Sequence, residues 1–453
     1  MVRGGWRRVL IPVLAVGLLA TGCVQQISGV GSFSSGLANV PDAKVPVVNT
    51  DNGPIDKLAG NAIADIQQFW TQQMPVVFNK HYQPVTAFYS IDPKGTVTAP
   101  CTNQPSDIRG NAFYCPSKDI VAWDRTGLFP ELDKTYGPFL VAMVLAHEWG
   151  HAIQHRTSAP SEKTIVVETQ ADCYAGSWVA YALKGQAPHF QITRDDLDQA
   201  LAGYLQFRDP VGTQQSDQQA HGSGFDRISA FQEGFEQGTK HCATFNDTRT
   251  FTEIPFATEE ELANQGNMPY DEMLVDGPKD IADYWNKNFE KTYDKKWTPL
   301  AHLTAYDAGQ NQPKCDGNAV ASLEYCPAND TIYYDDTALQ KIYSQTGDFG
   351  PITLIGVAYG QAVRKRLAKT VNGEDALLGS ICLAGSYAED VFPRAQPRRV
   401  DALLRLSPGD LDEALQSLLN FAGHSGIFDA KGTDGFDRVI AFQRGFSGIK
   451  ACG

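Results

Sequence analysis

The sequence predicts an α+β protein built from two homologous halves. Residues 63–78 have the spacing of a helix with a buried face, whereas 85–91 and 120–123 are short apolar segments of strand character. A further helical pattern at 144–154 follows these strands, and similar segments recur in the second half. We therefore expect each half to contain a small sheet followed by helices that carry the functional residues.

The length and composition are those of a folded protein with two domains. The chain has 453 residues, and 42% of them are apolar, which is enough for two sizeable cores. The formal net charge of −14 argues against a general nucleic-acid binder, because such proteins present a basic surface. No sequence segment after the N-terminus approaches the length of a membrane span.

The N-terminal residues predict export. Three arginines precede an apolar run at 9–19, and the four residues that end at Cys23 resemble a bacterial lipobox. We expect 1–22 to be a lipoprotein signal peptide and Cys23 to carry lipid, which would anchor the protein to the outer face of the bacterial cytoplasmic membrane. A plain secretory signal or an uncleaved anchor is the alternative. Residues 23–54, rich in Gly, Ser, Val and Pro, are predicted to be a flexible tether.

Several short sequences occur twice, about 210 residues apart. The clearest pair is Gly-Phe-Asp-Arg, which stands at 224–227 and again at 435–438. Only two copies on this scale indicate tandem homologous domains rather than a solenoid. We expect the domains to span 55–245 and 278–453, joined by a polar and acidic linker at 246–277.

The first half contains the motif His-Glu-x-x-His. On an α-helix, His147 and His151 lie one turn apart on the same face, so both imidazoles can reach one zinc ion. Glu148 then stands beside the metal without binding it and can take a proton from a zinc-bound water. This pattern is typical of a metallopeptidase helix. The alternative is a helix whose histidines face solvent or the core.

A second pair of polar residues can provide a third zinc ligand and a partner for a histidine ring. Glu168 and Asp172 are also four residues apart on a predicted helix. A catalytic zinc takes three protein ligands and keeps one open position, and Glu168 can be the third ligand. Asp172 is placed to accept the free ring N–H of a liganding histidine. The sequence therefore predicts Zn²⁺ bound by His147, His151 and Glu168.

The second half has lost all of these residues. When Gly150 is aligned with Gly360 and Cys173 with Cys382, the five predicted site residues are replaced by Val357, Ala358, Gln361, Leu377 and Ile381. Neighbouring scaffold residues persist, so the loss is selective, as expected of a functional site. We predict a degenerate second copy that cannot bind this zinc.

His221 is a further residue that the second copy lacks. It precedes Gly222-Ser223-Gly224, whereas the second half has Lys431-Gly432-Thr433-Asp434-Gly435 in this region and no histidine. We predict that His221 is a catalytic donor that steadies the oxyanion of the tetrahedral intermediate. An exposed loop histidine is the alternative.

Eight cysteines remain when Cys23 is set aside, and they form two matched sets of four. An exported compartment favours disulfides, and three pairings are possible within each half. We choose pairs that close a short strand-like loop and tie the ligand helix to the end of each domain: Cys101–Cys115, Cys173–Cys242, Cys315–Cys326 and Cys382–Cys452. Zinc ligation by Cys173 is the alternative.

Together, the motif at 147–151, the segment 168–176 and His221-Gly222-Ser223 resemble the bacterial putative neutral zinc metallopeptidases. These belong to the gluzincin group, whose third zinc ligand is a glutamate. The resemblance covers roughly 55–245 and, in decayed form, 278–453. It implies a zincin-like domain in two copies, and the lipobox adds a resemblance to actinobacterial lipoprotein peptidases.

Asn111 and Ala112 begin a segment that resembles the edge strand on which thermolysin-like gluzincins bind the substrate backbone. Such a strand offers unpaired N–H and C=O groups, so a peptide can add as an extra strand. The resemblance implies that Asn111 and Ala112 bind substrate. An ordinary disulfide-bound strand is the alternative.

The sequence thus predicts a zinc-dependent peptidase that hydrolyses peptide bonds through a metal-activated water, with Glu148 as general base. Its expected partners are a peptide or protein substrate, the membrane through the N-terminal lipid, and a protein that binds the second domain; nucleic acid is not expected. The alternative is a non-catalytic surface lipoprotein, a binding scaffold with a structural zinc. Such a zinc would not need Glu148, so its presence favours the enzyme.

Overall fold

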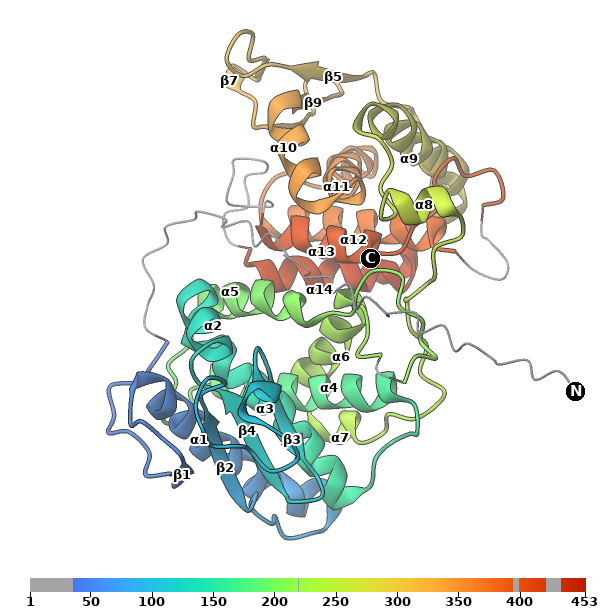
Figure 1. Ribbon diagram of the computed structural model, residues 1–453. Coiled ribbons are helices and arrows are strands. Elements are labelled where there is room, and N and C mark those ends of the chain that lie inside the picture. Colours follow the sequence, from blue (N-terminus) through green and yellow to red (C-terminus); the bar gives the residue numbers. More distant parts are fainter. Residues whose placement is uncertain (1–35, 219, 394–398, 421–432) are drawn as a thin grey trace, which may run out of the picture. The chain divides into compact units, whose positions relative to one another are not determined.

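The α+β class predicted from the sequence is confirmed in the computed structural model of the protein (Figure 1), which describes residues 36–453 apart from 219, 394–398 and 421–432. These described residues belong to one compact unit. The predicted signal peptide 1–22, Cys23 and the first part of the predicted tether lie outside the described residues.

The first half contains a four-stranded sheet of spatial order β1-β2-β4-β3. Its strands are β1 (Val47–Val48), β2 (Ala87–Ile91), β3 (Ala112–Cys115) and β4 (Ile120–Asp124). β2 runs parallel to β1 and β4, whereas β3 pairs antiparallel with β4 and lies at the edge of the sheet. Successive side chains of β4 enter two different apolar clusters, because strand residues alternate between the faces of a sheet.

Long helices build most of the first half. They are α1 (Pro54–Phe78), α2 (Leu128–Tyr136), α3 (Pro138–Thr157), α4 (Thr164–Leu183), α5 (Arg194–Tyr204), α6 (Gly224–Gln237) and the short α7 (Thr239–Cys242). α1 begins earlier than the predicted 63–78, because Pro54 suits the first position of a helix. α3 and α4 are buried along nearly their whole length, as helices that are apolar on all sides must be.

Residues 36–53, expected to belong to a flexible tether, are held against the first half. The N–H of Ala38 donates to the carbonyl of His189 at 2.8 Å. Further on, Val47 pairs with Phe88 in the parallel ladder between β1 and β2. Backbone pairing therefore attaches this part of the chain to the sheet.

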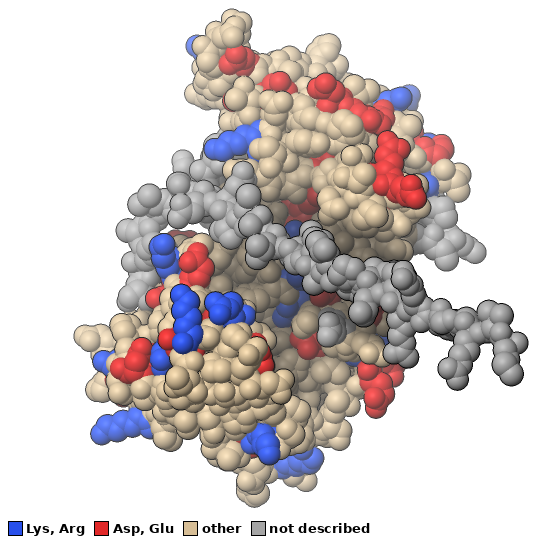
Figure 2. Space-filling view, in the orientation of Figure 1, with Lys and Arg blue, Asp and Glu red and all other residues tan. Residues whose placement is uncertain are grey.

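The predicted linker at 246–277 contains helical structure. α8 (Glu259–Ala263) lies within it, and α9 (Tyr270–Tyr293) continues across the predicted boundary at 278. Figure 2 shows acidic side chains over α8 and α9 on the face drawn, in agreement with the acidic sequence of this region.

Among the described residues, the second half follows much of the order of elements of the first, but it has no counterpart of β1 and adds the hairpin β6–β7. After α9 come β5 (His302–Tyr306), the hairpin β6–β7 (Lys314–Cys315 and Asn318–Ala319), β8 (Leu323–Cys326), β9 (Thr331–Asp335), α10 (Asp336–Thr346), α11 (Phe349–Arg366), α12 (Glu374–Val391), α13 (Asp410–Asn420) and α14 (Gly435–Phe446). β9 is parallel to β5 and antiparallel to β8, as β4 is to β2 and β3. The tandem duplication itself stays a prediction from the sequence.

Four disulfides join the cysteines in the pairs expected from the sequence, Cys101–Cys115, Cys173–Cys242, Cys315–Cys326 and Cys382–Cys452. The two long loops are closely matched, at 69 and 70 residues. Each long-loop bridge ties a buried helix, α4 or α12, to the end of its half. Among the helices described, none combines the length and apolar character that crossing a bilayer requires.

Three carboxyl groups are buried together in the second half. Oxygens of Asp348, Asp410 and Glu413 lie within 4.8 Å of one another. Each side chain accepts one backbone N–H, from Met268, Ser407 and Phe349 respectively. Burial and their mutual repulsion raise the pKa of Asp410 and of Glu413 well above the usual range.

This cluster predicts a pH-dependent loss of stability. A carboxyl whose pKa is raised by folding stabilises the native state below its unfolded pKa of about 4, and that contribution is lost as the pH rises through the folded pKa. Asp410→Asn should therefore raise the free energy of unfolding at pH 8 by on the order of 1 kcal/mol, with a much smaller difference at pH 4.

Urea unfolding of the full chain at both pH values measures this effect. Glu290→Gln on the exposed face of α9 is the control and should change the stability little at either pH. An Asp410→Asn variant that is no more stable than the wild type at pH 8 would contradict the account.

Candidate metal centre

The predicted site residues meet where α3 packs against α4. A Cβ atom at Gly150 would lie only 2.6 Å from the Cα of Ala171, so glycine is required for this close approach. The approach brings His147 and His151, on α3, against Glu168 on α4.

Three potential metal-ligating side chains converge at this place. Nε2 of His147 and Nε2 of His151 are 3.2 Å apart. The carboxylate of Glu168 lies 3.2 Å from the first nitrogen and 3.4 Å from the second. Tetrahedral zinc with bonds of 2.0–2.1 Å would hold its ligand atoms about 3.3 Å apart. The spacing therefore fits one zinc ion.

The other ring nitrogens are hydrogen-bonded in a way that favours this use. Nδ1 of His147 is 2.7 Å from Oδ1 of Asp172, and Nδ1 of His151 is 2.9 Å from Oε1 of Gln154. When each Nδ1–H donates, both Nε2 lone pairs face the carboxylate of Glu168. Three acceptors that face one another repel until a cation lies between them, and two imidazoles with a carboxylate are a typical zinc donor set.

A buried network holds Asp172 in turn. Arg227, on α6, donates to both carboxylate oxygens of Asp172 at 2.9 Å, and the hydroxyl of Tyr204 donates to Oδ1. Burial by itself would raise the pKa of Asp172, but Arg227 and His147 hold it well below the usual range. Asp172 is therefore a buried carboxylate with a fixed orientation and a retained charge.

The carboxylates also set the electrostatics of the histidines. Burial alone would lower the pKa of His147, but Asp172 and Glu168 raise it to about 10. The two carboxylates therefore favour a positive charge at this place. Since an imidazole must be neutral to bind a metal, a bound cation would take the place of this proton.

Glu148 lies beside the convergent atoms and is buried. Its Oε2 accepts the N–H of Tyr114, on β3, at 2.8 Å. Burial raises the pKa of Glu148, while His147 and His151 oppose that rise. The edge strand thus fixes the carboxylate that the sequence predicts to be the general base.

A cleft of about 1600 Å³ opens over this site, and the remaining predicted residues line it. Asn111 and Ala112 lie on its wall at the start of β3, and His221 lies on another part of the wall. Nδ1 of His221 is 3.3 Å from Oδ1 of Asp209, whose other oxygen accepts the backbone N–H of His221 at 2.6 Å. The structure therefore gathers all the predicted site residues of the first half in or directly behind one cleft.

Part of the edge strand is already hydrogen-bonded. The N–H of Ala112 donates to the side chain of Asn111 at 2.9 Å, and that of Tyr114 donates to Glu148. Both donors would have to be released before an added peptide could use them.

Three residues that support the site were not predicted from the sequence: Gln154, Tyr204 and Arg227. For Tyr204 a signal was present, because the repeated Asp-Leu-Asp segments align it with Leu418, so it differs between the halves as the site residues do. Arg227 gave no such signal, since the second half retains it as Arg438. There, the guanidinium donates to the carbonyls of Leu418 and Thr433 instead.

Comparison with known proteins agrees with this geometry. The model of a family described as putative neutral zinc metallopeptidase matches residues 8–245. Uncharacterized protein YpfJ of Escherichia coli K12 is 29% identical over 213 residues, which are 42% of this chain and 71% of the relative. Uncharacterized protein Mb2605 of Mycobacterium bovis is 30% identical over 179 residues, 34% of this chain and 60% of the relative. No solved structure shows significant similarity.

The network behind His147 yields a prediction on metal affinity. Asp172→Asn keeps the size of the side chain but removes the charge that orients the ring of His147. We expect zinc to bind roughly 10–100-fold more weakly, as is usual when such a partner is lost. Competition titration of the metal-free protein with a chromophoric chelator measures the change.

His147→Ala and Ile381→Val provide the reference points. The first removes a ligand and should abolish stoichiometric binding, whereas the second alters the corresponding position of the other half and should change nothing. Unaltered zinc affinity in Asp172→Asn would show that Asp172 supports packing only.

Proposed function

The chain belongs to the family of putative neutral zinc metallopeptidases, and from this premise we propose that it is a zinc-dependent peptidase that hydrolyses peptide bonds. The observation that carries the proposal is the convergence of His147, His151 and Glu168 at the base of a cleft, with Glu148 beside them.

Zinc would be held by His147, His151 and Glu168. When bound in such a site, zinc lowers the pKa of a water molecule and polarises the carbonyl of the substrate. Asp172 and Gln154 orient the two rings through Nδ1, so that Nε2 of each histidine is directed to the metal.

Glu148 carries the proton transfers in this proposal. It accepts the proton that the attacking water loses and delivers it to the departing amine. Because Oε2 is held by the N–H of Tyr114, we assign the transfers to Oε1. The peptide would lie along β3, at Asn111 and Ala112, which line the cleft beside Glu148.

His221 stabilises the negative charge that develops on the carbonyl oxygen of the substrate. Its Nδ1 is engaged by Asp209, which leaves Nε2 for the substrate. The hydrogen bond from His221 to Asp209 raises the pKa of the ring, which favours the protonated, donating form.

The scaffold alternative, with a structural zinc, receives less support. Structural zinc sites are usually closed by four protein ligands. In the part of the chain described, three donors converge and the site faces a large cleft. A structural zinc would also not need the buried carboxylate of Glu148 beside its ligands, whereas a reaction that transfers a proton would need it.

We also propose that the protein is exported and lipid-anchored through Cys23 to the outer face of the bacterial cytoplasmic membrane. The lipobox-like sequence supports this, and so do four disulfides, because such bonds persist in oxidising compartments. Its substrates would then be peptides or proteins outside the cytoplasm.

We infer that the second half is a degenerate copy of the first, produced by tandem duplication. Close helix contacts support this: a Cβ at Gly176 would lie 1.9 Å from the carbonyl oxygen of Phe231, and one at Gly385 would lie 2.0 Å from that of Phe442. These two pairs occupy equivalent places in the repeated sequence. Where the first half has its site residues, the second buries apolar side chains such as Val357.

The general-base role predicts the effect of one substitution. Glu148→Gln should reduce peptide hydrolysis by at least roughly 10²-fold, because the amide cannot take up the proton, while one zinc per chain remains bound. Metal analysis together with cleavage of a mixed peptide library measures both properties on the same preparation.

Glu236→Gln, on the exposed side of α6, is the matched control and should retain full activity. Undiminished turnover by Glu148→Gln would remove the proposed mechanism. Absence of zinc and of cleavage in the wild type would remove the proposed function.

A further inference from the structure

An aspartate of the second half caps a helix of the first half. The carboxylate of Asp412, on α13, accepts the N–H of Gly224 at 3.1 Å and that of Phe225 at 2.7 Å. These are the first two residues of α6, whose N–H groups have no partner within the helix. A negative charge at this end is also favoured by the helix dipole.

The reciprocal contact exists on the other side. Asp198, on α5, accepts the N–H of Gly435 and, at 2.8 Å, that of Phe436 at the start of α14. Asp198 and Asp412 stand at the same place in the repeated Asp-Leu-Asp segments. The two halves therefore contact each other as two subunits related by a two-fold axis would.

The helices that receive these caps also contact each other. The ring centroids of Phe225 and Phe446 are 4.9 Å apart, and those of Phe235 and Phe436 are 5.0 Å apart. Nε2 of Gln443 donates to the hydroxyl of Ser229 at 2.8 Å. α6 is thus held to the second half along its length as well as at its start.

Only one of the two caps leads to the metal centre. Arg227 lies in the first turn of α6, two residues after Phe225, the second residue that Asp412 caps. It donates to both oxygens of Asp172, which in turn bonds Nδ1 of His147. The equivalent helix α14 carries Arg438 in its first turn, but the position equivalent to Asp172 holds Ile381. The helix that Asp198 caps therefore does not orient a predicted zinc ligand.

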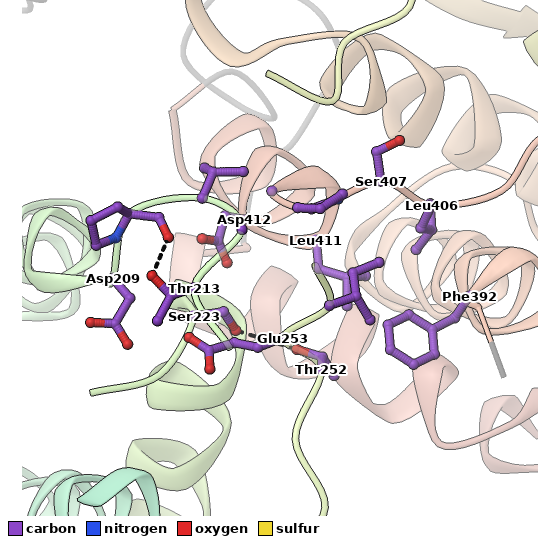
Figure 3. A pocket seen from close by; sticks show the side chains of 16 residues that line it. Asp209, Thr213, Ser223, Thr252, Glu253, Phe392, Leu406, Ser407, Leu411 and Asp412 are labelled. Atoms are coloured by element: carbon purple, nitrogen blue, oxygen red, sulfur yellow. Dashed lines mark hydrogen bonds between the residues drawn. The ribbon is translucent and has the colours of Figure 1, made fainter. Parts of the chain in front are cut away.

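Asp412 has a second link to the cleft. Its Oδ2 accepts a hydrogen bond from Nη1 of Arg208 at 2.8 Å, and the adjacent Asp209 orients His221. Figure 3 shows Asp412 facing the segment of Asp209 and Ser223 across a small cavity between α13 and the start of α6. Asp412 is buried, so these donors replace the water it would otherwise bind.

We propose that Asp412 is a positioning residue of the metal centre: the second half, which lacks the zinc residues, holds α6 so that Arg227 and Asp172 fix the ring of His147. This rests on the proposed function. In this proposal the degenerate half acts like a partner subunit within the same chain, and its role is to hold the residues that orient His147.

The near-symmetry of the interface provides the experiment. Asp412→Asn and Asp198→Asn, each in the full chain, remove one charge from equivalent caps. We expect both to lower the melting temperature by similar amounts. Asp412→Asn should in addition weaken zinc binding by about 10-fold, at the lower end of the usual range for such partners, and lower kcat more than it changes KM. Asp198→Asn should keep wild-type zinc affinity.

The measurement is a chelator competition titration of the metal-free proteins, with melting curves and peptide cleavage on the same samples. Asp412→Glu, which keeps the charge but displaces the carboxylate, is a second variant in case the amide prevents folding, and it should show an intermediate loss of zinc affinity.

Two results would overturn the inference. Zinc affinity equal to wild type in the folded Asp412 variants would show that the cap does not reach the metal centre. Equal weakening by Asp198→Asn would show an effect of the whole interface rather than of Asp412. Failure of the wild type to bind zinc or cleave peptides would instead overturn the proposed function, so the two failures are distinguishable.

Discussion

The site depends on the close packing of α3 against α4. At Gly150 the two helices are so near that no side chain fits between them. Only at this separation do the histidines of one helix and Glu168 of the other bring their acceptor atoms to within 3.4 Å. The same packing removes water, so the polar groups must be satisfied by one another or by a bound cation.

Because buried charges need partners, further polar residues surround the side chains that could bind the metal. A buried carboxylate such as Asp172 costs several kcal/mol unless it is paired and hydrogen-bonded. Arg227, Tyr204 and His147 supply these partners. The ring of His147 is therefore oriented by a network of residues that pairs the buried charge of Asp172. Through Arg227, this network extends to α6.

The second half has the same helix packing without charged residues at the positions that correspond to the site. Its helices α11 and α12 keep the close approach, since a Cβ at Gly360 would lie 2.6 Å from the carbonyl oxygen of Ser380. The buried positions that hold charge in the first half are apolar here, so these positions need no supporting network. This half can therefore hold α6 through the cap by Asp412 and through the aromatic contacts of α14.

Local patterns in the sequence determined the α+β class, the short strands and the one-turn spacing of the donor residues, because helix and strand periods are properties of consecutive residues. The matched cysteines left three pairings in each half, and the pairing chosen from the sequence is the one that the structure shows. The roles of Arg227 and Asp412 were decided only by the tertiary structure. Asp412 meets the first turn of α6 almost 190 residues away along the chain, and contacts at such separations depend on how helices pack, which no local period encodes.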